Sequence, residues 1–323
     1  TNLAYAAVWQ FPSFQSWLPT DIQPSHGFVA IVGALIMGLS SVMLIRRWPD
    51  RLSIIFPLMT PIWIMFSTGY SEIYPFVVAV FVAALSVIFD GTLESKSPLV
   101  VGFIAALLPL TYLGFAPLGI LLLFAYTVSN RKNSLRVLGY SILIFILLLA
   151  VFCSWSKTQF FGQLYSSMNL GEQNILFERY KDHSAGTNSI FFEPTYALSV
   201  EHLTDAAFVL FFGGGAIPLI LLIVGAFYYL TSGTNKAVMI LKDVRLWMAL
   251  AIIALHLHYL LFMIPKLGPV QDIDLFFQVF VVLAFFAGYV WDALQNNRDR
   301  KGCLQFVLVS IMIGYSMAVL NIL

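Results

Sequence analysis

The chain has 323 residues, of which 60% are apolar and only 10% charged, and its formal net charge at pH 7 is +1. Its mean hydropathy is +0.87. A soluble domain of this size needs a charged surface, so the composition excludes an ordinary soluble enzyme and gives no sign of a nucleic-acid partner. It indicates an integral membrane protein that crosses the lipid bilayer several times.

Ten apolar stretches follow one another along the chain, at 27–45, 53–69, 73–90, 98–113, 115–129, 136–155, 205–230, 246–264, 275–295 and 303–323. Hydrocarbon offers no partner for backbone N–H and C=O groups, and the alternating pattern of a membrane barrel is missing, so all ten should be helical. The predicted fold class is therefore all-α, with about ten transmembrane helices. Three short stretches that contain proline, 53–69, 98–113 and 115–129, predict broken, tilted or partly spanning helices.

Four segments follow from this pattern. Residues 1–26 form an outer interfacial segment rich in aromatic side chains, 27–155 the N-terminal transmembrane helices, 156–204 an extracytoplasmic loop, and 205–323 the C-terminal transmembrane helices. The first segment contains neither a signal peptide nor a spanning helix, and the chain starts with Thr1. We therefore expect residues 1–26 to be the tail of a first outer loop that follows an upstream helix.

The distribution of lysine and arginine predicts the orientation of the chain. Thirteen of the 17 basic residues fall in alternate loops, which is typical of cytoplasmic loops: Arg46, Arg47, Arg51, Lys96, Arg131, Lys132, Arg136, Lys236, Lys242, Arg245, Arg298, Arg300 and Lys301. The loops between them are expected outside, and they hold the other four: Lys157, Arg179, Lys181 and Lys266.

Residues capable of acid–base or metal chemistry gather on the expected outer side. Ten of the 16 carboxylates lie there, with His26, His183 and His202, while His256 and His258 lie in the outward half of the 246–264 stretch. Acidic outer loops also follow from keeping positive charge inside, so the carboxylates alone identify no site. That explanation does not account for the histidines.

The long outer loop ends in an amphipathic lead-in to the next helix. Loops of such length usually carry a lid, a binding surface or local helices. Between residues 198 and 205, one side is apolar and the other polar: Leu198, Val200 and Leu203 against Glu201, His202 and Asp205. The pattern fits a helix start with acidic residues near its positive end, or a site that His202 and Asp205 line beneath the loop.

Two short outer turns carry the remaining polar groups. Residues 69–75 hold Tyr70 and Glu72, and residues 266–276 hold Lys266 with an Asp-x-Asp pair, Asp272 and Asp274. Such a pair can direct both carboxylates to one cation or to a polar head group, and it can also cap the helix that follows. The two functions are compatible with each other.

Other common motifs are missing or point to structure. Cys153 and Cys303 fall near opposite ends of their helices, which excludes a disulfide between them. The run Gly213-Gly214-Gly215 lacks the Lys-Ser/Thr of a phosphate-binding loop. Close helix packing or a local kink is the favoured interpretation of these glycines.

The two outer turns carry a family resemblance. Gly-Tyr-Ser-Glu-Ile-Tyr at 69–74 resembles the Gly-Tyr-x-Glu-x-Tyr turn, and Gln-Asp-Ile-Asp-Leu-Phe at 271–276 resembles the Arg-Asp-Trp-Asp-Leu-Phe turn, of bacterial multispanning proteins related to GT-C glycosyltransferases. The order of short paired helices, one long outer loop and a final group of helices is similar too. Gln271 stands where that motif has Arg, and Ile273 where it has Trp.

The resemblance implies a GT-C-like fold and a transferase that takes a sugar from a polyprenyl-phosphate donor at the extracytoplasmic face of the bacterial inner membrane. The family's base is an acidic residue of the first outer loop, for which Asp21 is the candidate in this chain. Glu72, Asp272 and Asp274 are the other catalytic candidates, and a divalent cation, if one is used, would be held by Asp272 and Asp274. The substrate-binding candidates are Tyr70, Arg179, His202, His258 and Lys266.

Two other classes of function remain open. A non-catalytic subunit of a membrane protein assembly would use the same helices as packing surface, and its partners would be membrane proteins. A lipid or solute transporter is less favoured, because internal repeats are missing and ionisable residues are nearly absent from the helix centres. For His256 and His258, ligand binding and hydrogen bonding between helices are both open.

Overall fold

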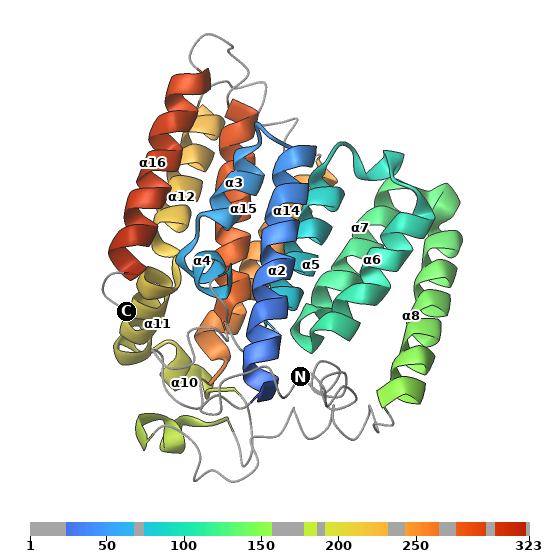
Figure 1. Cartoon of the computed structure of the whole chain (residues 1–323), viewed down its shortest axis with the longest axis horizontal. Helices are drawn as coiled ribbons and strands as arrows, with labels where there is room; N and C mark the ends of the chain where they lie inside the picture. Colours follow the sequence, from blue (N-terminus) through green and yellow to red (C-terminus); the bar gives the residue numbers. More distant parts are fainter. Residues whose placement is uncertain are drawn as a thin grey trace. The chain divides into compact units, whose positions relative to one another are not determined.

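The computed structural model describes residues 24–67, 74–156, 178–185, 191–231, 243–264, 276–294 and 301–320. Within these ranges the regular structure is helical, apart from two isolated bridges, Ser184–Phe192 and Phe191–Met263. The all-α prediction is confirmed (Figure 1). The chain divides into two compact units, which are described separately.

Unit 1 comprises residues 1–49, 65–158 and 233–252. Its helices are α2 (Pro24–Arg47), α5 (Tyr74–Phe89), α6 (Pro98–Thr111), α7 (Ala116–Ser129), α8 (Ser134–Ser156) and the first half of α14 (Val244–Phe262), with short helical turns η2 (Leu93–Ser95), η3 (Leu113–Phe115) and η4 (Arg131–Asn133). Small residues bring α6 close to its neighbours: a methyl group at Gly102 would lie 3.0 Å from Ser141 of α8, and one at Gly119 of α7 would lie 2.8 Å from the Ala105 carbonyl.

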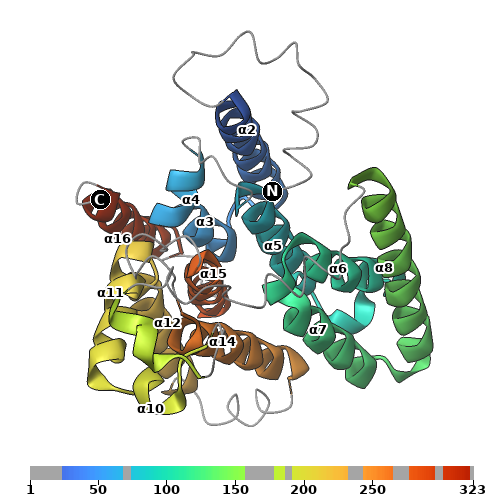
Figure 2. The ribbon, with the colours of Figure 1, turned by 90° about the horizontal axis from the view of Figure 1, so that it is seen from below.

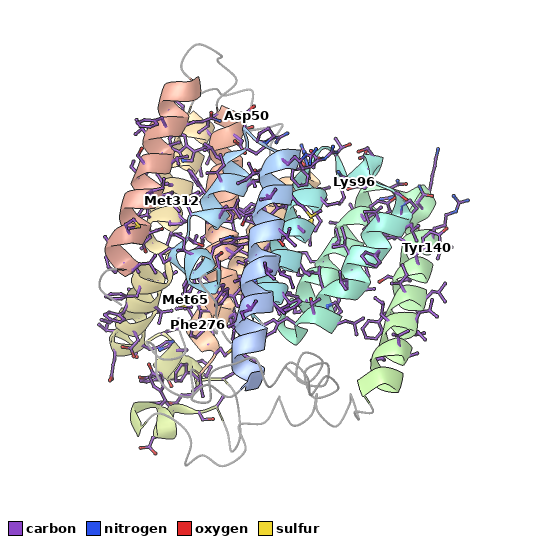
Figure 3. All side chains as sticks on the ribbon, in the orientation of Figure 1. Asp50, Met65, Lys96, Tyr140, Phe276 and Met312 are labelled. Atoms are coloured by element: carbon purple, nitrogen blue, oxygen red, sulfur yellow. The ribbon has the colours of Figure 1, made fainter. Side chains whose placement is uncertain are left out.

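The opposite face of α8 is apolar and exposed. Leu135, Ile142, Leu143, Ile146, Leu147 and Val151 are all more than half exposed, and Tyr140 projects from the same helix (Figure 3). A helix this apolar on its exposed face is typical of contact with lipid or with another apolar surface.

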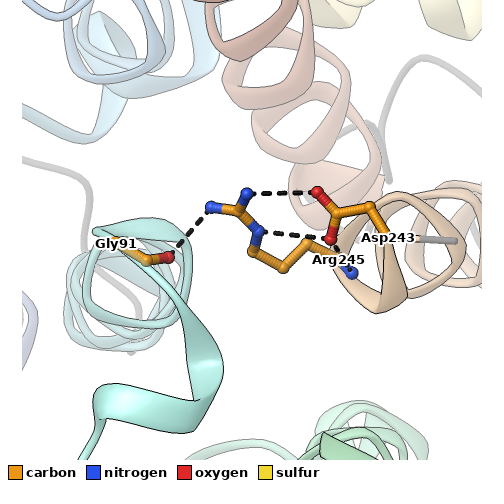
Figure 4. Close-up of polar contacts among 3 residues, drawn as sticks. All are labelled: Gly91, Asp243 and Arg245. Atoms are coloured by element: carbon orange, nitrogen blue, oxygen red, sulfur yellow. Dashed lines mark hydrogen bonds and ion pairs between the residues drawn. The ribbon is translucent and has the colours of Figure 1, made fainter. Parts of the chain in front are cut away.

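Polar contacts join the ends of several unit 1 helices. Arg245 donates from Nη2 to Oδ2 of Asp243 at 3.1 Å and from Nη1 to the carbonyl of Gly91 at 3.0 Å (Figure 4). Nearby along the chain, the Tyr126 hydroxyl donates to the Lys96 carbonyl at 3.0 Å. These bonds tie the beginning of α14 to the end of α5, and the end of α7 to the turn before α6.

Unit 2 comprises residues 50–64, 159–232 and 253–323. It contains α3 (Leu52–Leu58), the start of α4 (Pro61–Ser67), η6 (Glu178–His183), α10 (Pro194–Ala197), α11 (Val200–Gly213), α12 (Ala216–Thr231), the end of α14, α15 (Phe277–Leu294) and α16 (Lys301–Leu320). Helix α15 lies between α3 and α12, and α16 contacts both of these (Figure 2). All residues of α15 from Phe277 to Gly288 are buried, so this helix is the core of the unit.

The predicted stretch 53–69 is broken, as its prolines suggested. Helix α3 ends at Leu58, and α4 begins at Pro61. The Thr60 hydroxyl donates to the Pro57 carbonyl at 2.7 Å, and the Ser316 hydroxyl of α16 donates to the carbonyl of Met59. Side-chain hydroxyls thus satisfy carbonyls that the interrupted helix leaves without an intrahelical donor.

The stretch 205–230 is broken as well, at the glycine run. Helices α11 and α12 are bent by 95° with respect to each other. Gly214 has φ +98°, and a methyl group there would lie 2.4 Å from Cδ of Pro61, while one at Gly213 would lie 2.0 Å from the Phe280 ring. These glycines permit the kink and the close packing of the helices, as predicted.

The count of about ten spanning helices is wrong for the described residues. Among them, four helices are long and apolar enough to cross a membrane, at 30–47, 131–151, 244–262 and 277–294, and the bent pair α11–α12 would make a fifth. The other predicted stretches form helices with nearly the expected bounds. Helices α3 to α7 fall short of about 20 residues, which a straight crossing of the hydrocarbon core requires. Helix α16 has 20 residues, but its part counted as apolar, Leu304–Leu320, is also shorter than a candidate span.

Candidate functional site

The structure describes two of the nine predicted site residues in full, His202 and His258. The backbone of Arg179 lies in η6. Outside the described residues lie Asp21, Tyr70, Glu72, Lys266, Asp272 and Asp274. The cation site at Asp272 and Asp274 therefore stays a prediction, and within the described residues no group of three or more His, Cys, Asp or Glu side chains is placed to hold a metal ion.

His202 is buried at the beginning of α11. Its backbone N–H is capped by the Ser199 hydroxyl oxygen at 3.2 Å, and its Nε2 lies 2.7 Å from the carbonyl oxygen of Leu261 on α14. Because a carbonyl only accepts, Nε2 carries the proton in this contact. The ring also packs against Phe192, with 4.4 Å between centroids. His202 thus joins α11 to the end of α14.

Asp205 lies one turn further along α11 and accepts a hydrogen bond from the Tyr180 hydroxyl at 2.9 Å. Tyr180 is fully buried and meets the Phe192 ring edge to face, at 5.0 Å. His202 and Asp205 are therefore turned toward the protein, while Glu201 is exposed together with Leu198, Val200 and Leu203. Two described residues of the preceding segment, Tyr180 and Phe192, thus contact Asp205 and His202. That His202 and Asp205 line a binding site stays a prediction.

His183 contacts the same group of side chains through Tyr196. Its ring stacks on Tyr196 at 3.7 Å with an interplanar angle of 6°, and its Nδ1 lies 3.8 Å from Oε1 of Glu193. The His183 carbonyl accepts from the Glu193 N–H at 2.8 Å. We call Tyr180, His183, Phe192, Tyr196, His202 and Asp205 the histidine–tyrosine cluster.

Backbone pairing holds the cluster against α14. The Phe192 N–H donates to the Phe262 carbonyl at 2.8 Å, and the Ala185 N–H donates to the Phe191 carbonyl at 2.9 Å. Ile264, the last described residue before 265–275, packs into the cluster. Phe276, the first described residue after 265–275, is buried and meets Tyr259 at 5.9 Å. Both of these flanking residues therefore pack within unit 2.

His258 and His256 lie on different sides of α14. His256 is buried, which agrees with a structural function for this residue. His258 is exposed and stacks on Phe262 at 4.3 Å. Phe262 also packs against the cluster, so its ring separates His258 from the cluster.

Sequence reasoning missed Asp292, near the last turn of α15. Its Oδ1 accepts from the Leu52 N–H at 2.8 Å, and its Oδ2 accepts from the Ser53 N–H at 3.1 Å and the Ser53 hydroxyl at 2.9 Å. This carboxylate caps the N-terminus of α3 from another helix. The signal was a single acidic residue inside an apolar stretch, whose partners lie far away in the sequence.

The two ends of unit 2 thus differ in chemistry. The end with Asp292 and Arg51 lies where α15 finishes, and the histidine–tyrosine cluster lies at the other end, beside the last turn of α14. Comparison with known proteins adds no family assignment: no family model, no curated protein and no solved structure matches the chain.

Proposed function

We propose that the chain is an integral membrane glycosyltransferase of the GT-C-like type, which takes a sugar from a polyprenyl-phosphate donor at the extracytoplasmic face. The observation that carries the proposal is the histidine–tyrosine cluster. It combines histidine, tyrosine and carboxylate side chains at one end of apolar helices, and Ile264, which precedes residues 265–275 in the sequence, packs into it.

Membrane insertion is supported by the apolar candidate spans and by their exposed apolar side chains. In unit 2, the basic residues Arg51 and Lys301 belong to the end opposite the cluster, because Leu52 binds Asp292 and Gln305 donates to the Asp50 carbonyl at 3.0 Å. Under the positive-inside rule, the cluster end of unit 2 is extracytoplasmic.

A lipid-linked sugar suits this arrangement. Its polyprenyl chain is soluble in the bilayer and reaches the protein laterally, so the reacting head group arrives at the end of the helices. In the proposed reaction, a carboxylate among Asp21, Glu72, Asp272 and Asp274 deprotonates the acceptor hydroxyl, which attacks the anomeric carbon, and the polyprenyl phosphate leaves. Lys266 and His258 supply positive charge or hydrogen bonds to that phosphate.

The test uses the purified full chain in liposomes with a panel of radiolabelled polyprenyl-phosphate monosaccharides. We expect sugar transfer or release of polyprenyl phosphate with one donor, and loss of at least 100-fold in rate for Asp272→Asn or Asp274→Asn, with insertion unchanged. Glu201→Gln, an exposed carboxylate on α11, serves as the matched control and should keep the wild-type rate. Turnover at the wild-type rate in both aspartate variants would refute their catalytic assignment.

The exposed apolar face of α8 supports a second candidate, a non-catalytic subunit of a membrane protein assembly. In that case the face would pack against a partner's transmembrane helices, and the protein would co-purify with membrane subunits. Replacing Ile142 and Ile146 with tryptophan would then abolish co-purification. An unchanged complex would exclude α8 as the binding face.

A further inference from the structure

Helix α12 follows α15 over most of its length. A methyl group at Gly215 would lie 3.1 Å from Phe280, and one at Gly225 would lie 3.0 Å from Val290. Nε1 of Trp291 also donates to the Leu221 carbonyl at 3.0 Å. The start of α12 thus contacts the start of α15, and later residues of α12 contact later residues of α15, so the two helices run parallel and side by side.

Helix α11 does not continue this direction, because it meets α12 at 95°. The junction is firmly built: the Gly215 N–H donates to the Leu210 carbonyl at 2.7 Å, and the Tyr315 hydroxyl of α16 donates to the Phe211 carbonyl. The contact of Gly215 with Phe280 lies about one turn after the start of α15. The C-terminus of α11 is therefore level with the beginning of α15, at the same end as the histidine–tyrosine cluster.

The packed face of α11 contains His202, Ala206, Val209 and Gly213. The face turned away from the protein is mostly apolar, and Val200 on it is 82% exposed. Its exposed residues are Val200, Leu203, Ala207, Phe208 and Phe211, with Glu201 and Thr204 as the polar ones. An apolar outer face on a helix perpendicular to a neighbouring span is typical of helices that lie in the interface of a bilayer.

We propose that α11 lies in the membrane plane, with its apolar outer face in the boundary between head groups and acyl chains of the lipid. This rests on the membrane insertion part of the proposed function, since α15 defines the direction of the spans. With 14 residues, α11 extends about 21 Å along that plane. It holds His202 and Asp205 at head-group level, where a lipid-linked substrate presents its phosphate.

Spin labels on single cysteines measure this orientation directly. The chain has two native cysteines, Cys153 and Cys303, which are replaced by alanine. One pair of labels, at Val200 and Ala207, reports on α11, and the matched pair at Ile220 and Phe227 reports on α12. Members of each pair lie seven residues apart on one exposed face, or about 10 Å along the helix axis. Power saturation with oxygen and a nickel chelate then gives the depth of each label in phospholipid vesicles.

If α11 lies in the interface, the labels at Val200 and Ala207 share one shallow depth within a few ångströms, while those at Ile220 and Phe227 differ by about 10 Å. If the two labels on α11 differ in depth by as much as the two labels on α12, then α11 spans the bilayer. If both labels on α11 are in water, then α11 lies outside the lipid. Either result overturns the proposal and leaves membrane insertion intact. Labels in water at all four positions would instead refute membrane insertion.

Discussion

Replacing Gly288 with alanine should destabilise the protein, although alanine favours helices. A β-carbon at Gly288 would lie 2.3 Å from both the carbonyl carbon and oxygen of Leu52, and 2.4 Å from the nitrogen of Ser53. These are backbone atoms, which cannot rotate away as a side chain would. Restoring ordinary contacts of about 3.5 Å therefore requires α3 and α15 to separate by about 1 Å.

That separation also stretches the bonds from Asp292 to α3, which now measure 2.8 Å to the Leu52 nitrogen and 3.1 Å to the Ser53 nitrogen. Overpacking costs about 1–3 kcal/mol, and weakened hydrogen bonds to a carboxylate add about 1.5–3 kcal/mol. The higher helix propensity of alanine offsets only about 1 kcal/mol of this cost. We therefore expect the free energy of unfolding to fall by about 2–5 kcal/mol.

The assay is the thermal unfolding midpoint of the purified protein in detergent, with Gly314→Ala as the matched control. Gly314 also lies within a helix of unit 2, but a methyl group there would meet nothing within 4 Å. Its substitution should leave the midpoint unchanged or raise it slightly. Equal effects of the two substitutions, or a higher midpoint for Gly288→Ala, would refute the close packing of α15 on α3.

Three further predictions use the same assay. Asp292→Ala should cost about 2–4 kcal/mol because three donors lose a charged acceptor, and Asp292→Asn should cost about half as much because one acceptor oxygen remains; equal costs would argue against the cap. Gly214→Ala should destabilise more than Gly91→Ala: both have positive φ, which costs about 1–2 kcal/mol, but only the first methyl group would overlap a neighbour. Tyr180→Phe and Asp205→Ala should each cost about 1–3 kcal/mol, and the double variant less than their sum, since each removes the same hydrogen bond. Additive costs would show that the two side chains do not interact.

Helix positions were accessible from the sequence because hydrophobic stretches and prolines act locally. The breaks near Pro57 and at Gly213–Gly215 follow from residues that cannot continue a helix or that permit a positive φ. The number of spans was overestimated. An apolar composition does not distinguish a helix that crosses the bilayer from a shorter one packed inside the protein or lying in the interface.

The candidate site was accessible only in part. His202 and Asp205 stood out because polar residues alternate with apolar ones before a helix, but the pattern did not reveal that these two side chains face inward while Glu201 is exposed. Tyr180 and Tyr196 join them through pairing of the 178–197 segment with α14. Such long-range contacts leave no local pattern, and the same holds for the cap that Asp292 provides to α3.

Photo-crosslinking of a polyprenyl phosphate tests the central claim most directly. A probe with a photoreactive group near its phosphate would be bound to the full chain in nanodiscs, and the labelled peptides identified by mass spectrometry. The account predicts labelling of peptides from 178–205 and 257–276, competed by unlabelled polyprenyl phosphate but not by the polyprenol without phosphate. Labelling spread over the helices, or equal competition by the polyprenol, would contradict a head-group site at the histidine–tyrosine cluster.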